Sequence, residues 1–396
     1  MGIMLNYDAK SIIVVGAGIF GVTAALELAK RGHQVKLFDP GPLPHPEAAS
    51  TDISKVIRMG YGADEFYMEL MEIALYGWDN WNATWPQPLY HQDGVLFLSR
   101  TVMEPGGFEY DSHKFLKDRG HNPVRINPEI LKRKYPVWNA DRYPDGYFNP
   151  RGGWASSGKV VAQLILNAQA AGVALHEGEG FKKLIERDTH VTGIHTISGE
   201  DYYAEYVIVA AGAWTPIILP HLEKVMWSTG QPVMHFKVED IQAFQAPNFS
   251  VWGADVSNTG WYGFPAKDDG TLKVANHGPG WRTDPRGERR IPDGEEQHFR
   301  EFFRDTFPSL VNAPKIGERL CLYCDTWDGN FWIDHDPDRP GLIVCSGGSG
   351  HGFKFAPVLG QITSDVLEGR PNKFANRFAW RIPGQLANED ARFDDR

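Results

Sequence analysis

The sequence predicts a two-domain protein of mixed α/β and α+β class. A domain built on a parallel sheet is assembled from separated segments, and a second domain with an antiparallel sheet is inserted into it. Three stretches of the 396-residue chain carry this expectation: 11–21, 206–212 and 341–352. Each is a run of apolar residues that leads directly into glycine, and together they lie near both ends and in the middle of the chain.

The first stretch is the clearest, because it forms a complete strand–helix–strand pattern. Ser11–Val15 is a buried strand by composition, and the run Gly-Ala-Gly-Ile-Phe-Gly at 16–21 follows at once. Val22–Arg31 has helical composition, and Gln34–Phe38 reads as a second strand that ends at Asp39. This order within about 30 residues is typical of a Rossmann-like dinucleotide-binding unit.

The glycines have distinct physical roles in such a unit. Gly16 permits a tight turn, Gly18 lets the backbone approach a pyrophosphate, and Gly21 lets the helix pack closely on the strand. Asp39 is placed to accept hydrogen bonds from a ribose hydroxyl, which disfavours the 2′-phosphate of NADP. The choice between NAD and FAD stays open on this loop alone. The return of a glycine segment near the end of the chain favours FAD.

The domain boundaries follow from these units and from the composition between them. We expect an FAD-binding domain from residues 1–85, 150–225 and 321–385, and a substrate-binding domain from 86–149 and 226–320. The inserted stretches are rich in aromatic residues, proline and short alternating runs, which suit antiparallel strands.

Composition excludes several classes of function. The net charge of −10 disfavours binding to nucleic acid or to an anionic membrane, and no apolar run reaches the length of a membrane span. Three cysteines cannot form a disulfide scaffold, so we expect a cytoplasmic protein. Because all the motifs lie on one chain, we also expect a monomer. The chain shows no Ser/His/Asp triad and no metal-ligand spacing, so hydrolase and metalloenzyme functions are disfavoured and no metal is expected.

Three further blocks point to a family. They are Cys321-Leu322-Tyr323, the pair Tyr262–Pro265 and Leu272–His277, and Ser346–Phe355. In this order they resemble the monomeric sarcosine oxidase and N-methyltryptophan oxidase family of FAD-dependent amine oxidases, within the D-amino acid oxidase-like superfamily. The Gly-Gly-Trp-Ala run at 152–155 is similar to the branch of fructosyl amino acid, saccharopine and pipecolate oxidases.

The resemblance spans nearly the whole chain, and it implies both a fold and a reaction. The fold is an FAD domain with a sheet-rich substrate domain. The reaction is oxidation of the C–N bond of a secondary amino acid, N-substituted or cyclic, in which hydride passes to flavin N5. Oxygen would then be reduced to hydrogen peroxide, and the imine product would hydrolyse in water.

The same resemblance implies that Cys321 is attached through its sulfur to the 8α-methyl group of the flavin. Such a bond raises the reduction potential of the flavin. The alternative is an inert buried cysteine, with Cys324 as a nearby competitor for the link. A zinc or redox half-site at Cys321 and Cys324 is disfavoured, because no second cysteine pair exists. Tyr323 is expected to face the substrate pocket.

Lys273 matches the lysine that promotes reaction of the flavin with oxygen in this family. A nearby cation stabilises superoxide as it forms, so Lys273 would separate an oxidase from a dehydrogenase. Its alternative is a solvated lysine on a strand. His277 and Tyr262 match residues that line the substrate pocket, although a lone histidine is more often structural.

Arg58 and Lys354 match a pair of cations for the substrate carboxylate. A guanidinium binds a carboxylate through two parallel hydrogen bonds. The alternative for Arg58 is a salt bridge to an acidic side chain of the protein. The residues expected to bind the cofactor are Gly16, Gly18, Ile19, Phe20, Gly21, Asp39, Ser50, Thr51, Lys55, Gly212, Cys321, Gly348, Gly350, His351, Gly352, Phe353 and Lys354.

Three positions depart from the family pattern. Sarcosine oxidases carry His and Arg where this chain has Thr51 and Lys55, and Trp327 replaces a usual proline. These changes leave the substituent on the amine open. Two other functions also stay open: a dehydrogenase that passes electrons to a carrier, and a flavoprotein that acts within a complex. For the oxidase, the expected partners are O2 and an amino acid that has a carboxylate.

Overall fold

The computed structural model describes residues 9–393, and the chain divides into two compact units. Unit 1 comprises Met1–Ile53, Ser157–Trp227 and Cys324–Gln385, and unit 2 comprises Ser54–Ser156, Ser228–Tyr323 and Leu386–Arg396. Both units are discontinuous in sequence. The two units are defined by their compactness, whereas the predicted domains are defined by the ligand that each binds. The assignment of an FAD-binding and a substrate-binding domain therefore stays a prediction.

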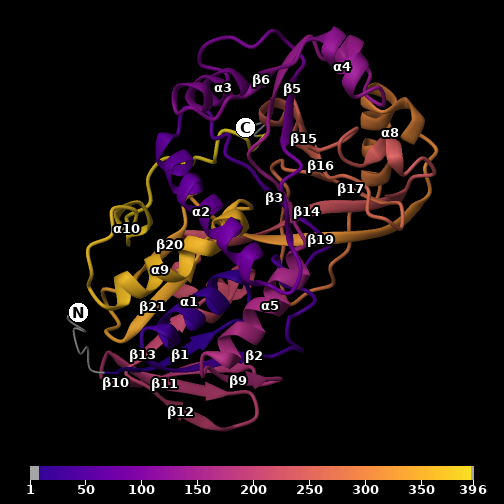
Figure 1. The fold of residues 1–396 in the computed structure, drawn as a ribbon. Helices are drawn as coiled ribbons and strands as arrows, with labels where there is room; N and C mark the ends of the chain where they lie inside the picture. The colour runs from indigo at the N-terminus through magenta and orange to yellow at the C-terminus, as the bar shows by residue number, and fades with distance from the viewer. Residues whose placement is uncertain (1–8, 394–396) are drawn as a thin grey trace. The chain divides into compact units, whose positions relative to one another are not determined.

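Unit 1 contains a six-stranded sheet in the order β20-β21-β13-β1-β2-β9 (Figure 1). Neighbouring strands pair in parallel, except that β20 runs antiparallel to β21. The strand bounds are β1 Ser11–Val15, β2 Gln34–Asp39, β9 Ala174–Glu177, β13 Tyr206–Val209, β20 Trp332–His335 and β21 Leu342–Ser346. This sheet confirms the predicted fold class, and the first, middle and last glycine stretches follow three adjacent strands of it.

The sheet of unit 1 is covered on both faces, which explains why its central strands are apolar throughout. Helix α1 (Ile19–Lys30) contacts α5 (Ser157–Ala170) and α9 (Ala356–Leu367), and Figure 1 shows these helices on one face. The other face is covered by a three-stranded sheet of β10 (Phe181–Arg187), β11 (His190–Thr196) and β12 (Asp201–Tyr203), whose apolar residues share one core with β1, β13 and β21.

Helix α1 begins at Ile19, three residues before the start that composition predicted. The glycine run explains the early start. A Cβ atom on Gly21 would lie 1.8 Å from the carbonyl oxygen of Gly16, so only glycine lets the first turn of the helix pack against the end of β1. Gly16 itself has a φ of +101°, a conformation that favours glycine.

Unit 2 contains a nine-stranded sheet, in the order β18-β14-β17-β16-β15-β5-β7-β6, with β19 paired to β14. Its bounds are β5 Val95–Ser99, β6 Val124–Arg125, β7 Asp145–Asn149, β14 Met226–Lys237, β15 Val251–Ala254, β16 Trp261–Gly263, β17 Thr271–Asn276, β18 Trp281–Arg282 and β19 Lys315–Thr326. Most neighbouring strands of this sheet pair antiparallel, but β5 and β15 pair in parallel. The sheet is therefore mixed, because the two inserted stretches of the chain meet at β5 and β15.

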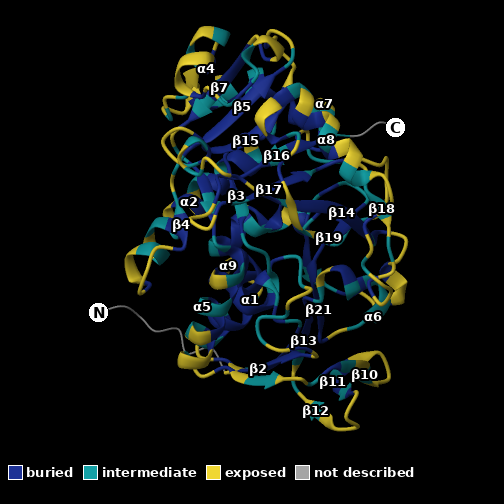
Figure 2. Ribbon diagram, turned by 90° about the vertical axis from the view of Figure 1, so that its right-hand side faces the viewer, coloured by how far each residue is buried: buried dark blue, intermediate teal, exposed yellow. Residues whose placement is uncertain are grey.

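Smaller elements complete unit 2. Strands β3 (Lys55–Ile57), β8 (Gly153–Ala155) and β4 (Tyr90–His91) form a three-stranded sheet. The main helices are α2 Glu65–Thr84, α3 Phe108–Asp118, α4 Pro128–Lys134 and α8 Glu295–Thr306. In Figure 2 the strands of the large sheet are mostly buried, whereas α4 is mostly exposed.

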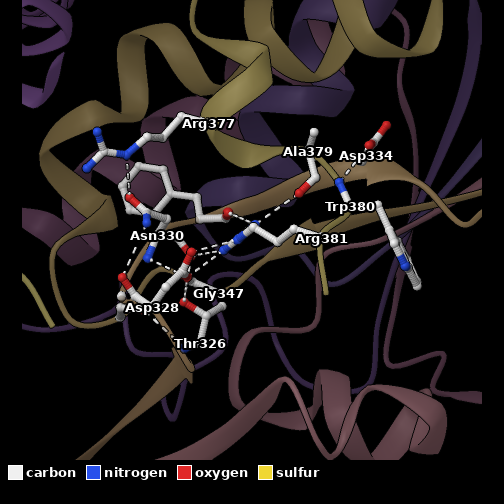
Figure 3. Close-up of polar contacts among 12 residues, drawn as sticks. Thr326, Asp328, Asn330, Asp334, Gly347, Arg377, Ala379, Trp380 and Arg381 are labelled. Atoms are coloured by element: carbon white, nitrogen blue, oxygen red, sulfur yellow. Dashed lines mark hydrogen bonds and ion pairs between the residues drawn. The ribbon is translucent and has the colours of Figure 1, made fainter. Parts of the chain in front are cut away.

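The segment that follows α9 is fastened to unit 1 by Arg381, after the short helix α10 (Ala375–Phe378) (Figure 3). The Arg381 guanidinium donates two parallel hydrogen bonds to the Asp328 carboxylate, each 2.7 Å long. It also lies over the Trp332 ring, 4.4 Å from the centroid. Arg377 adds a hydrogen bond of 2.9 Å from Nε to Asn330 Oδ1. The chain is thus firmly held at Arg381 before it continues to its C-terminus.

Candidate active site

The loop between β1 and α1 leaves room for a ligand beside Gly18. A Cβ atom on Gly18 would meet only Ser50 Oγ, at 3.5 Å, so no other part of residues 9–393 fills this side of the loop. The Ile19 amide donates to Ser50 Oγ at 3.2 Å. Gly212 follows β13, and a Cβ atom on it would meet no atom of the described residues within 4 Å. The open faces at these two glycines fit the close approach of a dinucleotide phosphate.

Asp39 lies at the end of β2 and is buried. Its Oδ2 accepts a hydrogen bond of 2.9 Å from the Ala17 amide, and its Oδ1 accepts one of 3.1 Å from the Gly41 amide. A carboxylate has about four lone-pair positions, so acceptor capacity is left for a ribose hydroxyl. Asp39 therefore both orders the glycine loop and fits its predicted role with FAD.

The second glycine segment, after β21, packs against the start of α1. Cβ atoms on Gly348 and Gly352 would lie 3.1 Å and 2.8 Å from the Phe20 ring. These two glycines therefore have a packing role that the sequence analysis did not foresee. His351 Nε2 lies 2.9 Å from the Gly329 carbonyl oxygen. Phe353 and Lys354 lie in a short 3₁₀ turn, Gly352–Phe355, that leads into α9.

Lys354 is buried in this turn. Its ammonium group donates a hydrogen bond of 3.0 Å to the carbonyl oxygen of His351. A buried ammonium group is stabilised by such acceptors or by an anion. Lys354 can thus serve as a cation for an anionic ligand of unit 1.

Cys321 is 1% exposed and lies in unit 2 on β19. The Lys55 ammonium group lies 3.8 Å from its sulfur. The other two cysteines have different surroundings. Burial raises the pKa of Cys324 to about 11 and that of Cys345 to about 12, which keeps both thiols protonated near neutral pH. Cys321 alone has a cation beside the sulfur among the three, so it is the better candidate for a covalent link.

Lys273 is 1% exposed and lies on β17, between β14 and β16. Its ammonium group donates a hydrogen bond of 2.6 Å to the Ser54 carbonyl oxygen and lies 4.6 Å from the centroid of the Phe264 ring. The alternative of a solvated strand lysine is therefore wrong. Because water is excluded from the interior, the charge of a buried ammonium group interacts more strongly with a negative charge that forms beside it than it would at the surface.

Arg58 follows β3 and is paired with a carboxylate of the protein. Its Nη2 donates a hydrogen bond of 2.6 Å to Glu389 Oε2, and its Nη1 donates to the Gly60 carbonyl oxygen. The guanidinium lies over the Tyr61 ring, 4.5 Å from the centroid. The alternative that the sequence left open, a salt bridge to an acidic side chain, is thus present. The partner comes from the C-terminal end of the chain.

His277 binds the other oxygen of the same carboxylate. Its Nε2 lies 2.8 Å from Glu389 Oε1. Burial lowers the pKa of His277, and the Glu389 carboxylate only partly opposes this shift. A neutral imidazole that donates from Nε2 satisfies this geometry. Glu389 is the residue that sequence reasoning missed, because it lies 331 positions from Arg58 and no local pattern marks it.

Two tyrosines lie beside His277. The ring centroids of His277 and Tyr323 are 5.7 Å apart, and those of His277 and Tyr262 are 6.4 Å apart. Burial raises the pKa of Tyr323 well above its usual value, and the neighbouring Tyr262 and Cys321 act in the same direction. The Tyr323 phenol is therefore a neutral hydrogen-bond donor. It can contact a substrate without adding charge.

The predicted site residues thus fall into two sets. Unit 2 brings together Arg58, Tyr262, His277 and Tyr323, and it also contains Lys55, Lys273 and Cys321. Unit 1 holds the glycine loops, Asp39, Ser50, Thr51 and Lys354. Within residues 9–393 the structure contains no group of acidic, histidine or cysteine side chains that could hold a metal ion, and no helix suited to cross a bilayer.

The parallel sheet, its open glycine loop and the acid after β2 define a dinucleotide-binding protein. Residues 11–366 match the family described as FAD dependent oxidoreductase, and the chain belongs to this family. It is an FAD-dependent oxidoreductase, as the resemblance in the sequence predicted.

Relatives of known activity and structure extend over almost the whole chain. The N-methyl-L-tryptophan oxidase of Salmonella dublin is 29% identical over 387 residues, which cover 93% of this chain and 97% of that protein. Fructosamine oxidase (Amadoriase II) from Aspergillus fumigatus, solved in complex with FSA, is 25% identical with a TM-score of 0.84, covering 98% of this chain and 94% of that one. Amadoriase I from the same organism, a fructosyl amine:oxygen oxidoreductase, is 27% identical with a TM-score of 0.80, covering 95% and 90%.

Proposed function

We propose that this protein is an FAD-dependent oxidase of secondary amino acids, N-substituted or cyclic. The observation that carries the proposal is Lys273, a lysine buried at 1% exposure where the resemblance predicts the lysine for oxygen activation. The similar proteins support the substrate class, because their names describe oxidation of an N-methylated or a fructosylated amine. When bound, FAD accepts hydride at N5 from the carbon beside the nitrogen and reduces O2 to hydrogen peroxide.

The side chains of unit 2 supply binding and orientation in this proposal. Arg58 binds the substrate carboxylate, and the resemblance implies Lys354 as a further cation for the same group. Tyr262 and Tyr323 form the walls of the pocket. His277 is neutral, because burial lowers its pKa, and so it adds no charge that would repel a protonated amine. The amine must lose its proton before hydride leaves, since the lone pair on nitrogen drives formation of the imine.

The glycine loop and Asp39 of unit 1 would hold the cofactor in this proposal: Gly16, Gly18 and the first turn of α1 would bind the pyrophosphate, and Asp39 the ribose. In unit 2, the Cys321 sulfur would bond to the 8α-methyl carbon in place of a hydrogen atom. The two electrons released by this oxidation would go to O2, which would become hydrogen peroxide. A cation at Lys273 stabilises superoxide, which is the first product when oxygen takes an electron. The imine leaves the site and hydrolyses in water.

Anaerobic mixing of the holoenzyme with candidate substrates tests the proposal. N-methyl-L-tryptophan, N-methylglycine, L-pipecolate and a fructosyl amino acid form the panel, and L-tryptophan is the matched primary amine. We expect at least one secondary amine to bleach the flavin absorbance, and L-tryptophan to leave it unchanged. A flavin that no member of the panel bleaches would show that the proposal is wrong.

An oxidase and a dehydrogenase differ in the compound that reoxidises the reduced flavin. After anaerobic reduction, the oxidase is expected to recover its colour on addition of air, with one hydrogen peroxide per imine. Recovery only with an artificial electron carrier would favour the dehydrogenase. We also infer a cytoplasmic location from the three cysteines, which cannot form a disulfide scaffold, and a monomer from the set of motifs on a single chain. Gel filtration of the holoenzyme tests the monomer and the alternative of a complex.

A further inference from the structure

The last described residues of the chain dock on unit 2 and bury their side chains there. Arg392 Nε donates a hydrogen bond of 3.1 Å to the Gly278 carbonyl oxygen, and the Phe393 amide donates one of 3.1 Å to the His277 carbonyl oxygen. Ala391 is buried beside them. The preceding stretch, 382–387, is exposed along its whole length. We call residues 388–393 the docked tail.

Glu389 is the charged residue of the docked tail that enters the site, and its side chain is 4% exposed. One carboxylate oxygen accepts from Arg58 at 2.6 Å, and the other lies 2.8 Å from His277 Nε2. A substrate amino acid would present the same chemical group, a carboxylate, to the same guanidinium. Glu389 therefore occupies the position at Arg58 that the proposed function assigns to the substrate.

Two carboxylates cannot share this position without cost. A second anion at hydrogen-bond distance from Arg58 would meet the negative charge of Glu389 in a buried setting, where like charges repel strongly. Arg58 Nη1 is already bound to the Gly60 carbonyl oxygen, so that nitrogen offers less for a second ligand. Binding of a substrate carboxylate to Arg58 thus requires Glu389 to withdraw.

The docked tail has features that suit withdrawal. The chain is fastened upstream by Arg381 to Asp328 (Figure 3), and the exposed stretch 382–387 lies between that anchor and Glu389. Asp390 lies against Gly62, where a Cβ atom would come within 2.5 Å of Asp390 Oδ2.

We propose that Glu389 is a specificity-determining residue that competes with the substrate carboxylate for Arg58 and His277, and that the docked tail leaves this position when an amino acid binds. The proposal rests on the assignment of Arg58 in the proposed function. Competition lowers the apparent affinity of every carboxylate ligand by the fraction of molecules in which the site is open. A ligand held mainly by its carboxylate therefore binds weakly. A substrate needs further contacts, such as those of a large side chain, to reach a useful affinity.

Glu389→Gln tests this inference, with Asp390→Asn as the matched control. Glutamine keeps the shape of the side chain and an acceptor for Arg58 but removes the charge. The probes are indole-3-acetate and the uncharged indole-3-acetamide, and their dissociation constants are measured in the holoenzyme from the change in flavin absorbance. We expect Glu389→Gln to tighten indole-3-acetate by about tenfold or more, equivalent to about 1.4 kcal/mol. Binding of indole-3-acetamide should stay unchanged, and Asp390→Asn should leave both constants within about twofold of the parent.

Unchanged or weaker binding of indole-3-acetate by Glu389→Gln would overturn the proposal, because a purely structural counterion does not compete. Hydrogen exchange of the unsubstituted holoenzyme gives an independent readout if the variant does not fold. Saturating indole-3-acetate should speed exchange in residues 388–393, and slower or equal exchange there would also overturn the proposal. Neither measurement requires turnover. A flavin that no secondary amine reduces would therefore refute the proposed function without deciding the role of Glu389.

Discussion

The Lys55 ammonium group lies 3.8 Å from the sulfur of Cys321, although the two residues are 266 positions apart in sequence. A cation at this distance stabilises the negative charge that develops on the sulfur when it acts as a nucleophile. Lys55 replaces the arginine that is usual in sarcosine oxidases, and the structure shows that the charge is kept beside the sulfur. This pair gives the proposed covalent bond a local chemical basis.

Cys321→Ser should abolish covalent attachment of the flavin. The hydroxyl that replaces the thiol is a far weaker nucleophile at neutral pH, so the cofactor would be bound without a covalent bond. The measurement is flavin absorbance in the pellet and the supernatant after acid precipitation. Cys324→Ser is the matched control and should keep the colour in the pellet. Free flavin from the unsubstituted protein would contradict the link altogether.

Lys55→Met should slow the covalent attachment, because it removes the cation beside Cys321 and leaves a side chain of similar length. We expect a smaller fraction of bonded flavin in freshly purified protein, rising on incubation with added FAD. Lys55→Arg keeps the charge and should behave as the parent. The same bonded fraction and rate in Lys55→Met would show that the cation does not assist the sulfur.

Lys273→Met should slow reoxidation of the reduced flavin by oxygen by about 100-fold, the order of magnitude for loss of one preorganised electrostatic contact. Stopped-flow mixing of the reduced holoenzyme with air-saturated buffer measures this rate. Anaerobic reduction by substrate should change much less, since Lys273 has no assigned role in hydride transfer. Lys267→Met, at an exposed lysine of the same unit, is the control and should leave both rates unchanged.

Glu109→Gln should stabilise the protein above neutral pH. Burial raises the pKa of Glu109 to about 7, and the charge of Asp255 acts in the same direction. Between pH 4.5 and pH 7 the Glu109 carboxyl therefore holds its proton in the folded state, whereas in the unfolded state it has already released the proton. Wild-type stability falls as pH rises from about 4.5 to about 7, and the full penalty, roughly 3 kcal/mol at most, is present above pH 7.

The free energy of unfolding at pH 5 and pH 8 measures this effect. Glu109→Gln should exceed the parent at pH 8 and approach it at pH 5, while Glu104→Gln, at an exposed carboxyl, should match the parent at both. A loss of stability in Glu109→Gln at pH 8 would show that the buried carboxylate has partners that glutamine cannot replace.

Local patterns in the sequence predicted the dinucleotide unit correctly. The strand Ser11–Val15 has the predicted bounds, because an apolar run between polar ends and glycine has few other conformations. The start of α1 was predicted three residues too late, since composition does not register that Gly21 packs on Gly16. The parallel pairing of β5 with β15 was not predicted, because it joins two inserted stretches that no local pattern relates.

The sequence by itself determined the glycine loop, its acid at Asp39 and the resemblance that names the family, since each depends on residues close together in the chain. Only the tertiary structure decided what surrounds the charged groups. The burial of Lys273, the pairing of Lys55 with Cys321 and the carboxylate of Glu389 on Arg58 all join distant segments. Such contacts depend on how the sheets pack, and the periodicity of apolar residues along the chain does not predict them.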